Sequence, residues 1–297
     1  MPRYPAPMDR RTFVQTGLAA SAAMAMGGAA SSEATGNAPA PVAPARGGRV
    51  KQSVCAWCFG GMKLEDLCTM AKGLGIGSVE LLDVEQLRVP ASLGMTCAVA
   101  NGPGGITKGW NRMEHHDDLV RKSEDLLPRI AAAGVPQMIV FSGNRAGLPD
   151  VDGIRNCAAG LKRIMPLAEK TGVTVIMELL NSKVDHKDYQ CDRTAWGVEL
   201  CKAVGSDRFR LLYDIYHMQI MEGDVIRTIR EHSTYINHYH TAGNPGRSNL
   251  DDTQELNYRG ICEAIVATGF TGWIAQEFTP RGDAAEALGK AVRICDV

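Results

Sequence analysis

The chain has 297 residues, with 32 basic and 33 acidic side chains and a formal net charge of −1. This balance provides no electrostatic field that favours nucleic acid or an anionic membrane surface. The length that remains after the first fifty residues are set aside is typical of one large α/β domain.

The first 48 residues have the pattern of an export leader. Arg10 and Arg11 precede an apolar stretch rich in Ala and Gly, and a tract rich in Pro, Ala and Ser follows. This order resembles a bacterial twin-arginine signal. Polar residues and glycines dilute the apolar stretch, which favours export over a membrane anchor. We therefore expect residues 1–48 to be signal peptide and disordered leader, with a periplasmic or extracytoplasmic location. The mature chain, residues 49–297, has no further apolar stretch of the ~20 residues that cross a bilayer.

Apolar runs alternate with amphipathic segments eight times along the mature chain. The expected strand and helix pairs are 53–59 with 64–75, 78–83 with 85–94, 95–101 with 114–134, 137–143 with 153–172, 173–180 with 192–205, 209–217 with 223–233, 235–243 with 254–269, and 272–278 with 284–296. Several expected helices end at a glycine, such as Gly134 and Gly172, as helices with a C-terminal glycine cap do. Eight such pairs predict a closed (β/α)8 TIM barrel in a single domain rather than an open doubly wound sheet.

Four polar residues stand at or near the ends of the last four expected strands: Glu178, Asp214, His240 and Glu277. They are separated by 36, 26 and 37 residues, each about the length of one strand, one helix and two loops. Because the carboxyl ends of barrel strands meet on one face, these side chains are expected to converge. Three carboxylates and an imidazole suit Mg²⁺ or Mn²⁺, with Co²⁺ tolerated. Taken singly, each residue is also compatible with a capping or barrel-interior role.

Three further residues accompany this set. His238 alternates with His240 on one strand, and we expect it to hydrogen-bond in the layer below. His217, three residues after Asp214, is placed to bond a substrate oxygen, although an ordinary loop histidine fits equally. Arg247 follows a turn at the barrel mouth, where a guanidinium binds carboxylates or polyols, and a surface arginine is the alternative.

Other residues receive a structural interpretation. Glu80 could contact substrate or cap a loop, and Trp57 could wall the pocket or fill the core; for both residues we favour the structural role. The nine cysteines are odd in number and scattered, so we expect buried reduced thiols rather than a disulfide framework. Cys55 and Cys58 form a CxxC inside an apolar run, where strand packing is favoured over redox chemistry.

Several segments of the second half carry a family resemblance. They are IMELLNSK, LLYDIYHMQIMEGD, INHYHTAGNPGR with the later ELNY, and the terminal QEF. Together they resemble the hydroxypyruvate isomerase family of the xylose isomerase-like TIM barrels, and related ketose 3-epimerases share the site pattern. The resemblance implies a divalent ion held by Glu178, Asp214, His240 and Glu277, with the two glutamates as acid and base. It also implies that His217 and Arg247 contact the substrate.

The expected activity is isomerisation or epimerisation of a small sugar, keto-sugar or hydroxy-keto acid through an enediolate. The first alternative is a metal-assisted lyase or hydrolase acting on a keto-glycoside. The second is a sugar-binding barrel without turnover, against which the two glutamates argue, because binding alone needs no acid and base. The oligomeric state stays open, with a homo-oligomer among the alternatives.

Overall fold

A computed structural model describes residues 48–297. The expected twin-arginine signal and almost all of the leader, residues 1–47, lie outside the described residues. None of the helices within residues 48–297 combines the length and the apolar character needed to cross a membrane.

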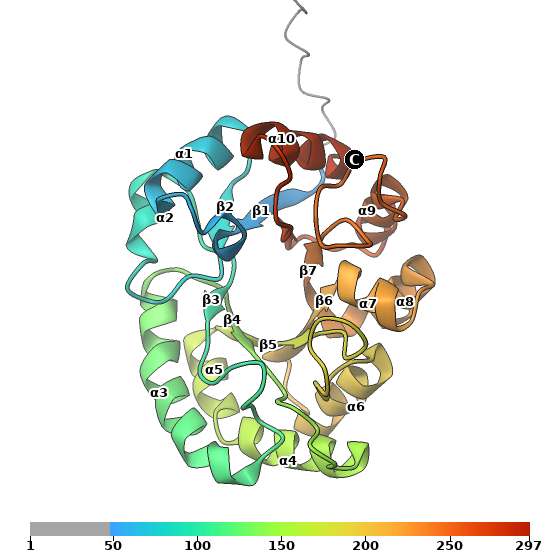
Figure 1. Cartoon of the computed structure of the whole chain (residues 1–297). Coiled ribbons are helices and arrows are strands. Elements are labelled where there is room, and N and C mark those ends of the chain that lie inside the picture. Colours follow the sequence, from blue (N-terminus) through green and yellow to red (C-terminus); the bar gives the residue numbers. More distant parts are fainter. Residues whose placement is uncertain (1–47) are drawn as a thin grey trace, which may run out of the picture. The chain divides into compact units, whose positions relative to one another are not determined.

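Parallel strands form the centre of this part of the chain, and helices surround them (Figure 1). The strands are β1 (Lys51–Cys55), β2 (Ser78–Glu80), β3 (Ala100–Asn101), β4 (Gln137–Val140), β5 (Thr174–Leu179), β6 (Phe209–Asp214), β7 (Ile236–Thr241) and β8 (Trp273–Gln276). They pair in the order β2-β1-β8-β7-β6-β5-β4-β3, and every pairing is parallel. The two ends of this order meet at the Leu82–Ala100 bridge, where the Asn101 amide donates to the Leu82 carbonyl at 2.9 Å. The predicted single-domain (β/α)8 TIM barrel is therefore confirmed.

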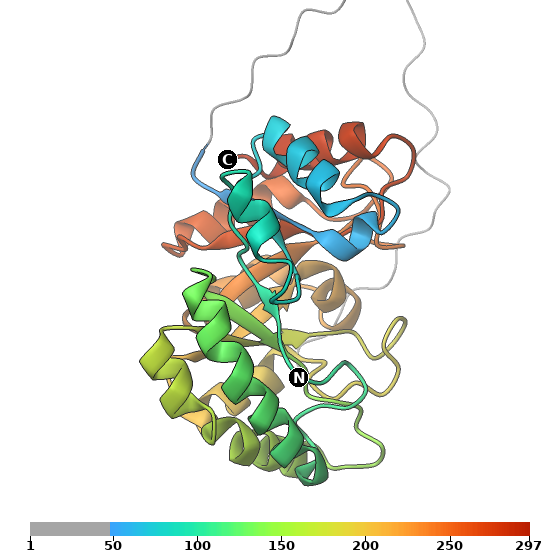
Figure 2. The ribbon, with the colours of Figure 1, turned by 90° about the vertical axis from the view of Figure 1, so that its left-hand side faces the viewer.

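The helices lie on the outside of the strands, as the side view shows (Figure 2). They are α1 (Leu64–Gly73), α2 (Arg88–Ser92), α3 (His116–Ala132), α4 (Asp150–Lys162), α5 (Met165–Thr171), α6 (Thr194–Val204), α7 (Ile215–Met221), α8 (Val225–His232), α9 (Tyr258–Ala267) and α10 (Ala284–Cys295). Gly172 follows α5 with φ of +78°, the left-handed conformation in which glycine is the favoured cap.

Several elements differ from the sequence prediction. The expected strand 53–59 ends at Cys55, and residues Ala56–Phe59, including Cys58 of the CxxC, form a short 3-10 helix. The expected helix 153–172 is two helices, because Pro166 has no backbone N–H to continue α4 and instead fits the first turn of α5. The expected strand 209–217 ends at Asp214, whose side chain accepts the His217 amide at 3.0 Å and so starts α7. The expected strand 95–101 has strand structure only in β3.

The barrel interior is filled rather than open. Ala98, Val99, Ile139, Ile176 and Leu212 are buried together in a small cluster. Their neighbours along the strands belong to the larger cluster that lies against the helices, as expected for side chains that alternate across a sheet. A packed interior leaves the strand ends as the place for polar side chains.

Candidate metal centre and active site

The four residues picked out by their spacing lie at the carboxyl ends of neighbouring strands. Glu178 is on β5, Asp214 ends β6, His240 is on β7, and Glu277 directly follows β8. One potential ligand atom from each lies within 4.8 Å of the others. All four residues are buried. Barrel closure therefore brings together the whole predicted set.

The contacts within this set leave oxygen atoms free. His240 Nδ1 lies 2.9 Å from Glu277 Oε2 and 3.4 Å from Glu178 Oε1. Asp214 accepts the His217 amide with Oδ1, while Asp214 Oδ2 has no hydrogen-bond partner among the described residues. Glu178 Oε1 is also buried and has no hydrogen-bond partner within residues 48–297. Buried, unpartnered carboxylate oxygens carry a desolvation cost, which a bound cation offsets.

The carboxylates experience different fields. Burial, followed by the negative charge of Glu277, raises the pKa of Asp214 well above its usual value and also raises the pKa of Glu178. Burial acts in the same direction on Glu277, but Arg247 and His240 outweigh it and hold the Glu277 pKa well below its usual value. The nearby cations thus outweigh burial at Glu277 but not at Asp214 and Glu178.

The donor types fit a hard divalent ion. Three carboxylates and one imidazole offer mainly oxygen ligands, as Mg²⁺ and Mn²⁺ prefer. Glu178, Asp214, His240 and Glu277 are the residues that would hold such an ion.

Arg247 lies beside this group, between two aromatic rings. Its Nη2 is 2.6 Å from Glu277 Oε2 and 3.5 Å from Asp214 Oδ2. The guanidinium carbon lies 5.0 Å from the centroid of the Trp57 ring and 5.7 Å from that of Tyr216. The side chain is 18% exposed, so Arg247 is not the surface arginine of the alternative interpretation. Its positive charge therefore lies directly beside two of the buried carboxylates.

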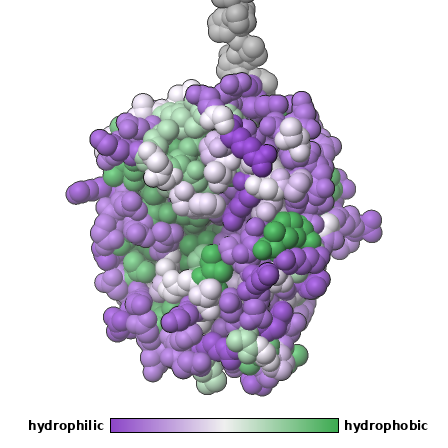
Figure 3. Space-filling model, in the orientation of Figure 1, coloured by the Kyte–Doolittle hydropathy of each residue, from purple (hydrophilic) through white to green (hydrophobic). Residues whose placement is uncertain are grey.

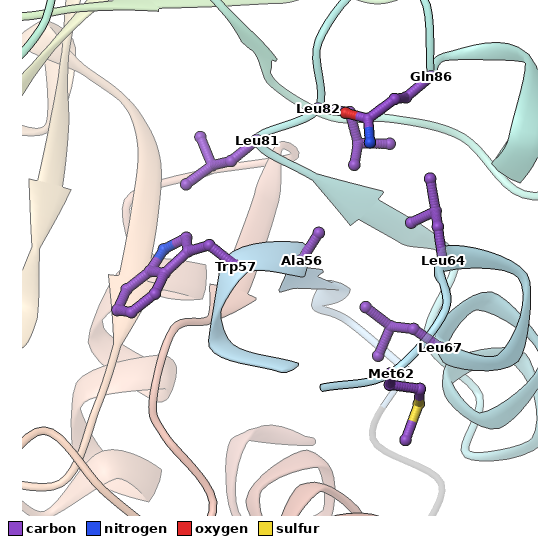
Figure 4. Close-up of a pocket in the computed structure, with 8 residues that line it drawn as sticks. All are labelled: Ala56, Trp57, Met62, Leu64, Leu67, Leu81, Leu82 and Gln86. Carbon is purple, nitrogen blue, oxygen red and sulfur yellow. The ribbon is translucent and has the colours of Figure 1, made fainter. Parts of the chain in front are cut away.

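Trp57 belongs to the site and not to the core, so the structural interpretation of this residue was wrong. It is 47% exposed, and its indole Nε1 donates to Glu277 Oε1 at 2.8 Å. Trp57 also lines a neighbouring pocket of about 290 Å³ with Leu81, Gln86 and several apolar side chains (Figure 4). On the face shown in Figure 3, apolar surface gathers around a central hollow within a mostly hydrophilic rim.

His217 is buried next to Asp214, with its Nε2 3.7 Å from Asp214 Oδ2. The Asn181 side-chain amide donates to His217 Nδ1 at 2.6 Å, which leaves the proton on Nε2. Nε2 has no hydrogen-bond partner within the described residues. Burial and the Arg247 charge lower the His217 pKa, so the ring is neutral and offers one N–H beside the metal group.

Glu80 and His238 lie behind His240, and the sequence interpretation was right for His238 but not for Glu80. His238 is buried as expected, but Glu80 does not cap a loop, because its Oε1 lies 2.7 Å from His238 Nε2 and 3.0 Å from His240 Nε2. Burial would raise the Glu80 pKa, but the two histidines lower it to about 2. Cys55, Glu80 and His240 also have ligand atoms within 4.8 Å of one another. Glu80 ends an apolar run just as the four site residues do, and that signal could have identified it.

Comparisons with known proteins agree with this architecture. Residues 85–295 match the family model described as xylose isomerase-like TIM barrel. The chain is 37% identical over 122 residues to a 2-oxo-tetronate isomerase of Cupriavidus necator, covering 41% of this chain and 46% of that protein. It is 30% identical over 112 residues to a hydroxypyruvate isomerase of Escherichia coli, covering 38% of this chain and 43% of that protein. The matched segments thus span less than half the length of these two relatives.

Solved structures resemble the barrel more completely. A protein described as AP endonuclease, family 2, from Brucella melitensis superposes with a TM-score of 0.74 and 23% identity, covering 80% of this chain and 97% of that one. A D-psicose 3-epimerase from Clostridium cellulolyticum superposes with a TM-score of 0.67 and 17% identity, covering 82% and 90%. At these identities the likeness establishes the fold, and the family model that matches most of the chain establishes the rest: this chain belongs to the xylose isomerase-like TIM barrel family.

Proposed function

We propose that the protein is a divalent-metal-dependent isomerase or epimerase of a small sugar, keto-sugar or hydroxy-keto acid. The observation that carries the proposal is the pair Glu178 and Glu277, two buried glutamates that join Asp214 and His240 in one group within 4.8 Å. The names of the relatives, hydroxypyruvate isomerase and 2-oxo-tetronate isomerase, support the same reaction class.

The reaction needs a proton moved beside a carbonyl group. A divalent ion, when bound, supplies electrostatic stabilisation for two neighbouring substrate oxygens as negative charge develops on them. One of the two glutamates removes the proton from the carbon that bears the hydroxyl group, next to the carbonyl carbon, and the other returns a proton. Return to the former carbonyl carbon, with movement of the hydroxyl proton to the former carbonyl oxygen, gives isomerisation. Return to the opposite face of the same carbon gives epimerisation.

The neighbouring side chains hold the substrate. His217 presents its free Nε2–H to a hydroxyl or carbonyl oxygen, and Arg247 presents a positive charge that suits a carboxylate or several polyol oxygens. Trp57 keeps Glu277 in place by donating to its Oε1 and walls one side of the site. Fixing these groups before the substrate arrives lowers the cost of reaching the reactive geometry.

Solvent exchange tests the proposal. Protein freed of metal with EDTA and reloaded with Mn²⁺ is incubated in D₂O with hydroxypyruvate, 2-oxo-tetronates and ketoses, and products are examined by NMR and mass spectrometry. We expect deuterium at the carbon beside the carbonyl only in substrate or product incubated with the reloaded protein. Glu178→Gln and Glu277→Gln should each abolish the exchange, whereas the exposed Glu231→Gln should not.

The same assay separates the alternatives. Loss of an aglycone from an added keto-glycoside would favour the lyase. Wild-type exchange rates in both glutamine variants would rule out acid and base roles for these residues. Binding without exchange of any candidate substrate would favour the sugar-binding barrel.

A further inference from the structure

Glu80 joins two histidines across the barrel interior. It ends β2, is fully buried, and its Oε1 lies 2.7 Å from His238 Nε2 and 3.0 Å from His240 Nε2, both on β7. In the sheet, β2 and β7 are separated by β1 and β8. The carboxylate therefore reaches a histidine pair on a strand that is not its neighbour.

Gln137, which contacts the other ring nitrogen of His238, determines which atom donates in the hydrogen bond to Glu80. Gln137 Nε2 lies 3.4 Å from the Ala98 carbonyl oxygen, which can only accept, so this end of the amide is the nitrogen. Gln137 Oε1 in turn accepts from Asn237 Nδ2 at 2.8 Å. The same Gln137 nitrogen donates to His238 Nδ1 at 3.3 Å. His238 must then carry its proton on Nε2, which donates to Glu80.

The same donor and acceptor argument extends to His240. Glu80 Oε1 already accepts from His238, so it is placed as an acceptor for His240 Nε2 as well. The other nitrogen of His240, Nδ1, is the one that lies 2.9 Å from Glu277 and 3.4 Å from Glu178. Nδ1 therefore faces the candidate metal centre, and Nε2 is turned away from it.

We propose that Glu80 is a positioning residue for metal binding, which accepts the Nε2 hydrogen of His240 and so keeps Nδ1 turned toward the ion. In the absence of an ion, Nδ1 is hydrogen-bonded to Glu277 instead. This orientation is set before any ion binds by a series of hydrogen bonds that links Gln137, His238, Glu80 and His240. A carboxylate behind a metal-binding imidazole fixes its tautomer and makes it more basic, and loss of such a partner weakens metal binding by about 10- to 100-fold. The inference rests on the metal centre proposed above but not on any substrate.

Metal titration tests the role of Glu80. The Glu80→Gln variant keeps the shape of the side chain and removes its charge. We expect Mn²⁺ affinity, measured by isothermal titration calorimetry on metal-free protein, to fall about tenfold or more. Asp192→Asn is the matched control: Asp192 is also a buried carboxylate, but it accepts from Ser182 and lies near Arg145, and its variant should bind Mn²⁺ within about twofold of wild type.

A spectroscopic measurement on the wild-type protein tests the orientation itself. Two-bond ¹H–¹⁵N spectra of histidine-labelled, Mg²⁺-loaded protein report which ring nitrogen carries hydrogen. We expect His240 to show protonated Nε2 and unprotonated Nδ1, and the Glu80→Gln variant, if folded by circular dichroism, to show averaged tautomers. A protonated Nδ1 in the loaded wild type, or undiminished Mn²⁺ affinity in Glu80→Gln, would overturn the inference.

The outcome is separable from that of the proposed function. If the wild type binds Mn²⁺ with the expected His240 tautomer but exchanges no substrate proton, the isomerase proposal fails and the role of Glu80 stands. If it isomerises a substrate but Glu80→Gln binds the ion as tightly as wild type, only the role of Glu80 fails. If no divalent ion binds, both fail.

Discussion

The carboxylate of Asp214 should lower the stability of the metal-free protein. The same carboxylate should be needed for metal binding. Asp214 is fully buried, and its Oδ2 lacks a hydrogen-bond partner among the described residues. Burial and the charge of Glu277 raise its pKa well above the usual value. Because the folded pKa lies above the unfolded one, the carboxyl favours the fold at acidic pH and opposes it as the pH rises.

Asp214→Asn keeps the Oδ1 acceptor that caps α7 and removes the buried charge. A buried charged group without full hydrogen bonding costs about 1–3 kcal/mol, so the metal-free variant should melt about 2–12 °C above the metal-free wild type at pH 8. This difference should shrink as the pH falls. Mn²⁺ at about 100 times its Kd should stabilise the wild type by about 2.7 kcal/mol, or about 5–11 °C, and the variant far less.

Differential scanning fluorimetry with and without Mn²⁺ measures both effects. Asp192→Asn is again the control. Its melting temperature should fall rather than rise, because the substitution removes a charged carboxylate that accepts a hydrogen bond from the Ser182 hydroxyl at 2.5 Å. A metal-free Asp214→Asn protein that melts below the wild type, together with an unchanged Mn²⁺ shift, would refute the reasoning.

Three shorter predictions follow from other parts of the chain. Because the Trp57 indole donates to Glu277, Mn²⁺ addition should change the tryptophan fluorescence, and Trp57→Phe should abolish most of this change; an equal change in the variant contradicts this. All nine cysteines are free and buried, and burial raises the pKa of Cys201 to about 12, so Ellman's reagent at pH 8 should label fewer than about one thiol per native chain and nine after unfolding in guanidinium. Replacing Arg10 and Arg11 together with lysine should keep the protein in the cytoplasm, as cell fractionation would reveal, and undisturbed export would count against the twin-arginine prediction.

The architecture was largely predictable because each segment carries its own pattern. Apolar strands, amphipathic helices and terminal glycines are local signals, and eight repeats of one unit leave few topologies open. The errors lie where a single side chain overrides the pattern. Asp214 turned an expected strand end into the cap of α7, and Pro166 divided one helix into two.

The spacing along the chain was enough to predict that Glu178, Asp214, His240 and Glu277 share one end of a barrel, because the carboxyl ends of parallel barrel strands lie on the same face. Which atoms face one another could be seen only in the folded molecule. Glu80 is 160 residues from His240 in sequence, and its carboxylate touches that imidazole through the barrel interior. Trp57 is 220 residues from Glu277 and donates to it from outside the core. Such contacts depend on how the sheet closes and on the direction of each side chain, which spacing along the chain does not encode.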